Sequence, residues 1–330
     1  MILKGGFMIK SQDDFFSQVD QIIPFIGADK LKELHQSNWR LDILVLGIVL
    51  IAFFSLFYYL GSEKIGTLWL CAFFIQGMVL QLIGFLGHEL FIHRNVFGKK
   101  LGYLCSLLIF APLTVSTTEY KIMHLKHHDT LNTKNDAEDY KNDLDRRWKR
   151  WLMLTVFGQL LARPRFFANK DRPINYDFHT DPEMQKPENK KKVRLENTFI
   201  VAFLGSMILL SFYSNYVLYG YLLPIIITLP IWSLTRLVLE HGTIDPKNPI
   251  DAVTFYKTNM LTGWIFLNDT GDYHLVHHLF PKIPSYNMPR ALKLMYPYFK
   301  QKGVTERHSI FKLLYFYLIK NYPYRTKWPD

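Results

Sequence analysis

Residues 198–235 read TFIVAFLGSMILLSFYSNYVLYGYLLPIIITLPIWSLT, and none of these side chains is charged. A helix needs about 20 predominantly apolar residues to cross the hydrocarbon core of a bilayer. The stretch is therefore long enough for two short crossings, and we expect it to turn near Ser214-Asn215 or at Gly220. The sequence predicts membrane helices at about 198–215 and 219–239.

Two earlier stretches have the same character. Residues 41–60 carry only Asp42 as a charge, and residues 65–87 carry none. Each fits one crossing, which gives four spans arranged as two helical hairpins. The alternative is a set of buried helices in a large soluble core, but runs this long and free of charge disfavour it.

Two further segments are apolar but are not expected to cross. Residues 101–117 are interrupted by Pro112, and residues 151–167 by polar side chains and a proline. A crossing at 101–117 would separate the histidines before it from those after it. We expect both segments to lie in the interface or beneath a polar cap.

The 330-residue chain has a formal net charge of +11, and residues 281–330 hold ten Lys or Arg against Glu306 and Asp330. Basic flanks are typical of the cytoplasmic side of membrane proteins. We therefore expect a single domain, residues 1–330, whose cap (residues 88–197 and 240–330) and both termini are cytoplasmic. No groove-reading motif accompanies the charge, so nucleic acid is not an expected partner.

Nine of the twelve histidines fall into four groups. The groups follow the second and fourth predicted spans or lie in the predicted cap, so all of them are expected at one membrane face. Single histidines at 35, 179 and 308 are expected at the surface instead. The nine candidate metal ligands are His88, His93, His124, His127, His128, His241, His274, His277 and His278.

The spacing within each group has a geometric meaning. Positions i, i+3 and i+4 share one face of a helix, so each H-x-x-H-H trio directs three imidazoles into one space. His88 and His93 are five residues apart, about 140° around an ideal α-helix. Either the helix ends between them or they serve two different metals. Nine ligands suit two ions with open positions, although imidazole alone does not distinguish iron from zinc, copper or nickel.

Carboxylates next to the histidines could accept the second ring N–H and so orient the ligands. The candidates by adjacency are Glu89, Asp129, Glu240 and Asp272. Each could equally be a helix cap or an ordinary ion-pair partner.

The series H-x4-H, H-x-x-H-H, a lone His and a second H-x-x-H-H resembles the membrane fatty-acid desaturase and hydroxylase superfamily. The similarity is most specific in HLVHHLFPKIPSYNMPRA, residues 274–291. The resemblance implies an all-α membrane fold with a cytosolic cap, nine histidine ligands to two Fe ions, and O₂ as co-substrate. It also implies a fatty acyl substrate linked to lipid, CoA or a carrier protein, and an external electron-transfer protein.

Three features of the sequence differ from the patterns of particular subgroups. Stearoyl-type desaturases have Asn one turn before the lone histidine, whereas this chain has Leu237. Front-end desaturases usually begin the third box with Gln, whereas here it is His274. The sequence contains no His-Pro-Gly-Gly heme segment, so we expect electrons from a separate donor. These departures leave desaturation as the leading function and hydroxylase, ketolase or decarboxylase chemistry as the alternative within the enzymes.

A non-enzymatic membrane metal or heme protein is the alternative of a different class. Transport is disfavoured because the histidines cluster at the ends of the predicted spans and not at the membrane midplane.

Residues 309–320, SIFKLLYFYLIK, form a short aromatic segment flanked by bases. It is too short to span and is expected to lie in the membrane interface. The alternative is a helix packed wholly against the cap.

Overall fold

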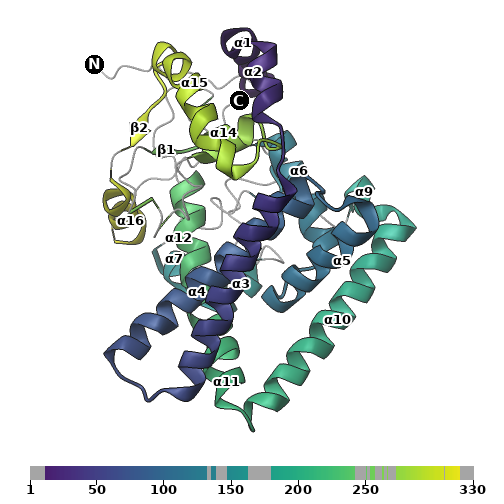
Figure 1. Ribbon diagram of the computed structural model, residues 1–330, viewed down its shortest axis with the longest axis vertical. Helices are drawn as coiled ribbons and strands as arrows, with labels where there is room; N and C mark the ends of the chain where they lie inside the picture. Colours follow the sequence, from purple (N-terminus) through teal and green to yellow (C-terminus); the bar gives the residue numbers. More distant parts are fainter. Residues whose placement is uncertain are drawn as a thin grey trace.

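The computed structural model describes residues 12–131, 135–138, 147–162, 180–241, 250, 253–256, 262–263, 266, 273–307 and 309–319. Within these residues, four helical segments are long and apolar enough to cross a membrane. Figure 1 shows them side by side in the lower part of the molecule. They are α3 (Trp39–Ser62), α4 continued by η1 (Thr67–His93), α10 (Pro187–Ser211), and α11 continued through η5 and η6 to α12 (Asn215–His241).

The fourth long helix is not uniform. It begins with α11 (Asn215–Val217), passes through two π-helical segments, η5 (Leu218–Leu222) and η6 (Pro224–Thr228), and ends as α12 (Leu229–His241). The turn between α10 and α11 lies at residues 212–214. Of the two positions at which the sequence predicted a turn, this is the one near Ser214-Asn215. Three of the four long helices extend past the apolar runs through polar residues: η1 continues α4 to His93, α10 begins at Pro187 before a run of lysines, and α12 ends at His241.

Glycines allow the long helices to pack closely. A Cβ added at Gly77 of α4 would overlap Thr228, whose carbonyl carbon would lie 2.8 Å away. A Cβ at Gly220 would lie 2.7 Å from the carbonyl oxygen of Phe57 in α3. The buried Gln76 side chain donates to the Gly220 carbonyl at 2.7 Å. Small residues at such contacts are typical of membrane helices, which associate through close van der Waals packing and interhelical hydrogen bonds.

The Pro- and Lys-rich stretch 181–194 has the composition of a solvated loop, but in the structure it is helical, with most of its side chains exposed. Residues of this stretch form α9 (Pro182–Gln185) and the first turns of α10. Asp181 caps α9 by accepting from the Glu183 N–H at 2.8 Å. Pro187 occupies the first turn of α10, where its missing N–H has no helical partner to lose. The lysines that follow are good helix formers and carry the helix out of its apolar section.

The segment after η1 turns back on itself. It consists of α5 (Gly98–Phe110), the short η2 (Ala111–Leu113) and α6 (Thr117–Thr130), with a bend of 94°. The buried carboxylate of Glu196 in α10 fixes this bend. It accepts hydrogen bonds from Tyr103 Oη (2.7 Å), Ser116 Oγ (2.6 Å), and both the backbone N–H (2.9 Å) and the hydroxyl (2.6 Å) of Thr118.

Shorter elements gather at the other end of the molecule from the lower helix turns (Figure 1). An apolar core there contains Ile22, Leu275 and Met295, among others. These elements are α1 (Gln12–Ile26), α2 (Ala28–Leu34), α14 (His274–Leu279), η9 (Ser285–Asn287), α15 (Met288–Gln301) and a two-residue parallel pair of β1 (Phe255–Tyr256) and β2 (Glu306–Arg307).

Three short helices lie beside α12. The described part of the apolar segment 151–167 forms the end of α7 (Arg147–Met153) and α8 (Val156–Ala162). The C-terminal aromatic segment forms α16 (Ile310–Leu318). Both α7 and α16 contact α12.

The fold generates a topological prediction. The bent segment 98–130 should begin and end on one side of the membrane, because Nε2 of His93 before it lies 3.0 Å from Nε2 of His124 near its end. Cysteines replacing the exposed Lys100 and Lys121 should therefore react equally with an impermeant reagent in sealed vesicles. A cysteine at Glu63, between α3 and α4, is the control and should react only from the opposite side. Opposite accessibility of positions 100 and 121 would contradict this topology.

Candidate metal centre

His88 and His93 lie in one π-helical turn, η1, at the end of α4. In a π-helix the hydrogen bonds join residues five apart, so side chains with this spacing come to the same face. Their Nε2 atoms are 2.8 Å apart. The sequence suggested that the helix ends between them or that they serve two metals. Neither alternative is what the structure shows, because a widened turn brings both rings to one point.

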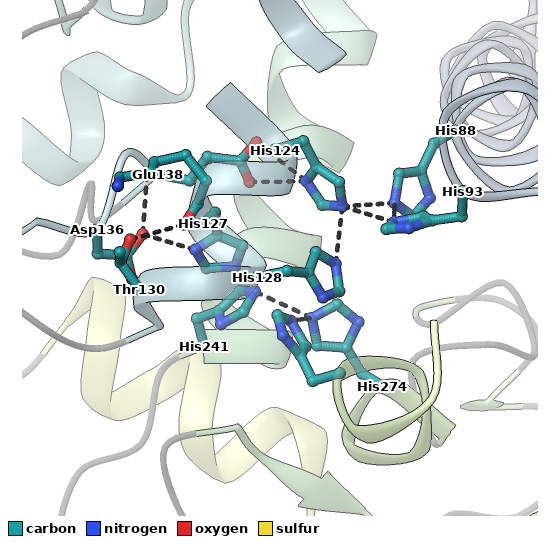
Figure 2. A network of polar contacts seen from close by, with 12 residues as sticks. His88, His93, His124, His127, His128, Thr130, Asp136, Glu138, His241 and His274 are labelled. Atoms are coloured by element: carbon teal, nitrogen blue, oxygen red, sulfur yellow. Dashed lines mark hydrogen bonds and ion pairs between the residues drawn. The ribbon is translucent and has the colours of Figure 1, made fainter. Parts of the chain in front are cut away.

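Five histidines from three helical segments, η1, α6 and α14, meet at this point. The ligand atoms of His88, His93, His124, His128 and His277 all lie within 4.8 Å of one another. Nε2 of His124 is 2.7 Å from Nε2 of His88 and 3.0 Å from Nε2 of both His93 and His128. Figure 2 shows these rings pointing toward one another from opposite sides.

The position of the ring proton of His124 decides what its Nε2 atom offers to the neighbouring nitrogens. Its Nδ1 lies 3.0 Å from a carboxylate oxygen of Glu138, which only accepts hydrogen bonds, so Nδ1 carries the proton. Nε2 of the neutral ring then presents a lone pair to the neighbouring nitrogens. Two nitrogens that each lie about 2.1 Å from one ion, at right angles, are about 3.0 Å apart. The spacing therefore fits a shared cation.

A second group lies beside the first. Ligand atoms of His127, His241 and His278 are also within 4.8 Å of one another, as are those of Glu240, His241 and His274. Nε2 of His274 lies 2.9 Å from Nε2 of His241 and 3.1 Å from Nε2 of His278. The rings of His128 and His278 stack with centroids 4.4 Å apart and connect the two groups. All nine predicted histidines are thus in one buried region, divided in a way that suits two ions.

The surroundings of the His277 ring show most directly whether a metal would fit this site. Both of its ring nitrogens are buried and have no hydrogen-bond partner among the described residues. A buried polar atom left unpaired costs about 1–3 kcal/mol, so a structural histidine in this position would be unfavourable. Burial lowers the pKa of His277, and also of His128, His274 and His278, well below the usual value. Neutral rings with available lone pairs are the form that binds metal.

Three of the four carboxylates proposed from adjacency lie in the described structure, and they differ. Glu240 Oε1 lies 3.6 Å from Nδ1 of His274 and also pairs with Arg236 at 2.6 Å. Glu89 faces away from the rings toward Arg94 and the Ser285 N–H, each at 2.9 Å. Asp129 is exposed. The Glu240–His274 contact is longer than a hydrogen bond, so the geometry favours the ion-pair role for both Glu240 and Glu89, while Asp272 lies outside the described residues.

Two carboxylates that adjacency did not single out contact the ligands directly. Asp136 Oδ1 lies 2.6 Å from Nδ1 of His127, and Glu138 contacts Nδ1 of His124 (Figure 2). Burial alone would raise the pKa of Glu138, but the His124 ring lowers it below the usual value, so the carboxylate is ionised. The available signal was the acidic sequence NDAEDY, residues 135–140. Of these residues, Asp136 and Glu138 contact α6, although they lie 9 and 14 residues from their histidine partners.

Buried ion pairs connect the first histidine group to the rest of the fold. Arg94 follows η1 and donates to Asp42 of α3 at 2.6 Å and to Glu89 at 2.9 Å. Glu89 in turn accepts from the backbone N–H of Ser285, which follows the last histidine group in the sequence. The side chains of all three charged residues are almost completely buried. This network joins α3, η1 and the segment after α14, and so holds two ligand-bearing elements together.

The single histidines are placed differently. His35 is the C-cap of α2 and is half-buried, with its Nδ1 2.8 Å from the Leu31 carbonyl oxygen and its ring packed against Phe280. His179 and His308 lie outside the described residues.

A cavity of about 340 Å³ leads away from the histidines between α4, α8 and α12. His88, His124, His241 and His274 line one end. The remaining wall mixes apolar side chains with polar ones such as Gln81 and Gln159, and it includes three charged groups, Glu138, Arg236 and Glu240. Leu237 belongs to this wall, together with Phe85, Phe110, Leu113, Ile225 and Leu229. A flexible, mostly apolar molecule would fit this space with one section against the rings.

The chain is similar in sequence to known proteins. The family model described as fatty acid desaturase matches residues 65–310, which include all nine histidines. A probable fatty acid desaturase from Sorghum bicolor is 25% identical over 254 residues, 70% of this chain and 64% of the relative. An omega-3 fatty acid desaturase, chloroplastic, from Sesamum indicum is 26% identical over 252 residues, 70% of this chain and 56% of the relative.

The chain spans less than two thirds of the length of these two plant proteins. It covers more of an sn-1 acyl-lipid omega-3 desaturase (ferredoxin) from Nostoc, with 23% identity over 292 residues, 83% of this chain and 78% of the relative. The match of the family model over most of the chain, with four apolar helices and the buried histidine groups inside it, shows that this protein belongs to the fatty acid desaturase family.

Proposed function

We propose that this protein desaturates a fatty acyl chain at a centre of two iron ions held by the nine histidines. The observation that carries the proposal is the convergence of nine buried imidazoles, four of which line a partly apolar cavity. The family match supports it independently.

The histidines, the two carboxylates and the cavity wall would have different roles in this reaction. Bound iron would supply, with O₂, the oxidising power needed to remove hydrogen from an unactivated methylene. Asp136 and Glu138 accept the Nδ1–H of His127 and His124, which directs the Nε2 lone pairs of those rings inward. The apolar cavity wall would hold the acyl chain extended, exclude water, and determine which carbons lie next to the rings.

The names of relatives suggest the partners. The Nostoc relative is named as an acyl-lipid, ferredoxin-dependent enzyme, and an Arabidopsis relative as an acyl-lipid desaturase with cytochrome b5. We therefore propose a lipid-linked acyl substrate and a separate electron-transfer protein. We further propose that the four spans form two helical hairpins beneath a helical cap. The turns within the two hairpins carry few Lys or Arg, whereas the rest of the polar chain carries many. This distribution supports an orientation with the metal centre and both termini on the cytoplasmic side.

Lipid analysis of a desaturase-deficient host tests the activity. Expression of this chain should produce a fatty acid with one new double bond, accompanied by loss of its saturated or less unsaturated precursor. Hydroxy, keto or chain-shortened products would instead indicate the alternative chemistry of the same superfamily. No modified acyl chain in several hosts that supply ferredoxin or cytochrome b5 would contradict the proposal.

Removing one ligand should reduce metal binding. We expect His277→Ala to lower the iron content of the purified protein and to abolish product formation, because no described residue forms a hydrogen bond with either ring nitrogen of His277. The control is His35→Ala, whose ring lies at the C-cap of α2 and contacts Leu31 and Phe280 instead. Iron measured by mass spectrometry distinguishes the two. Full iron occupancy and activity in His277→Ala would show that the ligand assignment is wrong.

The carboxylates offer a matched pair for a second test. Asp136→Asn should weaken metal affinity about 10- to 100-fold, because the amide no longer holds His127 by a charge-assisted hydrogen bond. Asp129→Asn lies on the exposed side of the same region and should leave affinity unchanged. Competition with a metal chelator measures both. Equal affinities would show that Asp136 does not orient a ligand.

A further inference from the structure

The C-terminal helix α16 has two apolar faces with different surroundings. Ile310 and Leu313 are buried in a cluster that includes Leu234 and Val238 of α12. Phe311, by contrast, is 60% exposed, and Tyr315 and Ile319 follow it at intervals of four residues along the exposed side. The sequence suggested either an interfacial helix or one packed wholly against the cap. The structure shows one face packed and the other uncovered.

The neighbouring helices α7 and α8 expose aromatic side chains as well. Trp148 and Trp151 of α7 are each about half exposed, and Phe157 of α8 is 70% exposed. The Trp151 indole N–H donates to the Leu318 carbonyl at 3.2 Å, which joins α7 to the end of α16. Exposed apolar side chains therefore gather on three adjoining short helices, which we term the aromatic shelf (α7, α8 and α16).

The shelf is continuous with the surface of the long helices. The Trp232 indole of α12 donates to the Phe74 carbonyl of α4 at 2.8 Å, and the Phe74 side chain is itself exposed. The Trp232 ring lies 6.0 Å from that of Phe266, which lies 5.2 Å from that of Phe311. A row of aromatic rings thus runs from two candidate membrane spans to the exposed face of α16.

We propose that the aromatic shelf is a lipid-contact surface that lies in the headgroup layer of the bilayer. Trp and Tyr favour this layer because their rings are apolar while the N–H or O–H group remains hydrated. The exposed Lys312, next to Phe311, can extend its ammonium group to lipid phosphates while its methylenes remain in apolar surroundings. The partner is the phospholipid surface itself, because the row of rings leads directly into helices that cross the hydrocarbon core.

The shelf also borders the cavity. Val156 and Gln159 of α8 line the cavity, and Gln159 donates to the Pro230 carbonyl of α12 at 2.9 Å. Phe157, between them in sequence, is exposed on the outside. Helix α8 therefore separates the cavity from the surface that we assign to lipid.

Spin labels in nanodiscs containing phosphatidylcholine and phosphatidylglycerol test the assignment without depending on enzymatic activity. Single cysteines would replace Phe311 and Phe157, and each label's collision rates with oxygen and with a water-soluble nickel chelate would be compared. Val201, 71% exposed on α10, is the lipid control, and the exposed Lys293 of α15 is the water control. An unchanged unfolding temperature would confirm that each variant is folded.

Labels at 311 and 157 should favour oxygen over the chelate, as the label at 201 does. Lys312→Glu should at least halve this preference at position 311 in anionic discs, whereas Lys293→Glu should leave it unchanged. Chelate accessibility equal to that at position 293 would overturn the proposal. Protection from both reagents would also overturn it, because it would indicate a covering protein surface.

Discussion

The structure depends on one constraint, the convergence of several imidazole rings in a buried region. Nε2 atoms of His88, His93, His124 and His128 approach one another to between 2.7 and 3.0 Å. A neutral ring whose Nδ1 donates a hydrogen bond presents a lone pair at Nε2. Lone pairs that converge in this way are favourable when a cation lies between them, and the surrounding fold holds together the helices that carry these rings.

The long helices place the rings at one level of the molecule. His88 and His93 occupy the end of α4 with η1, and His241 occupies the end of α12. The other ligands come from α6 and α14, which lack the length to hold their own position. Two buried networks hold these helices in place. Glu196 joins the start of α6 to α10. Arg94 joins η1 to α3 and, through Glu89, to the segment after α14. Buried charges are costly unless fully paired, so these networks also specify one arrangement of the helices.

The cavity connects the histidine groups with the candidate membrane spans. The cavity extends from the histidines between two candidate membrane spans, so an acyl chain could remain in apolar surroundings while one section lies beside the rings. Exposed aromatic side chains on α7, α8 and α16 adjoin this cavity. A short amphipathic helix is stable here because its packed face is held by α12 and its outer face need not meet water.

The sequence by itself determined the apolar spans, the nine histidines and their grouping, because charge-free runs and i, i+3, i+4 spacing are local properties. It could not determine how His88 and His93 converge, since the widening of one helical turn depends on what the turn packs against. It also missed Asp136 and Glu138, whose contact with the ligands requires the chain to return over α6. Only the tertiary structure decided which carboxylates orient the rings, because hydrogen bonding depends on distance in space and not on adjacency along the chain.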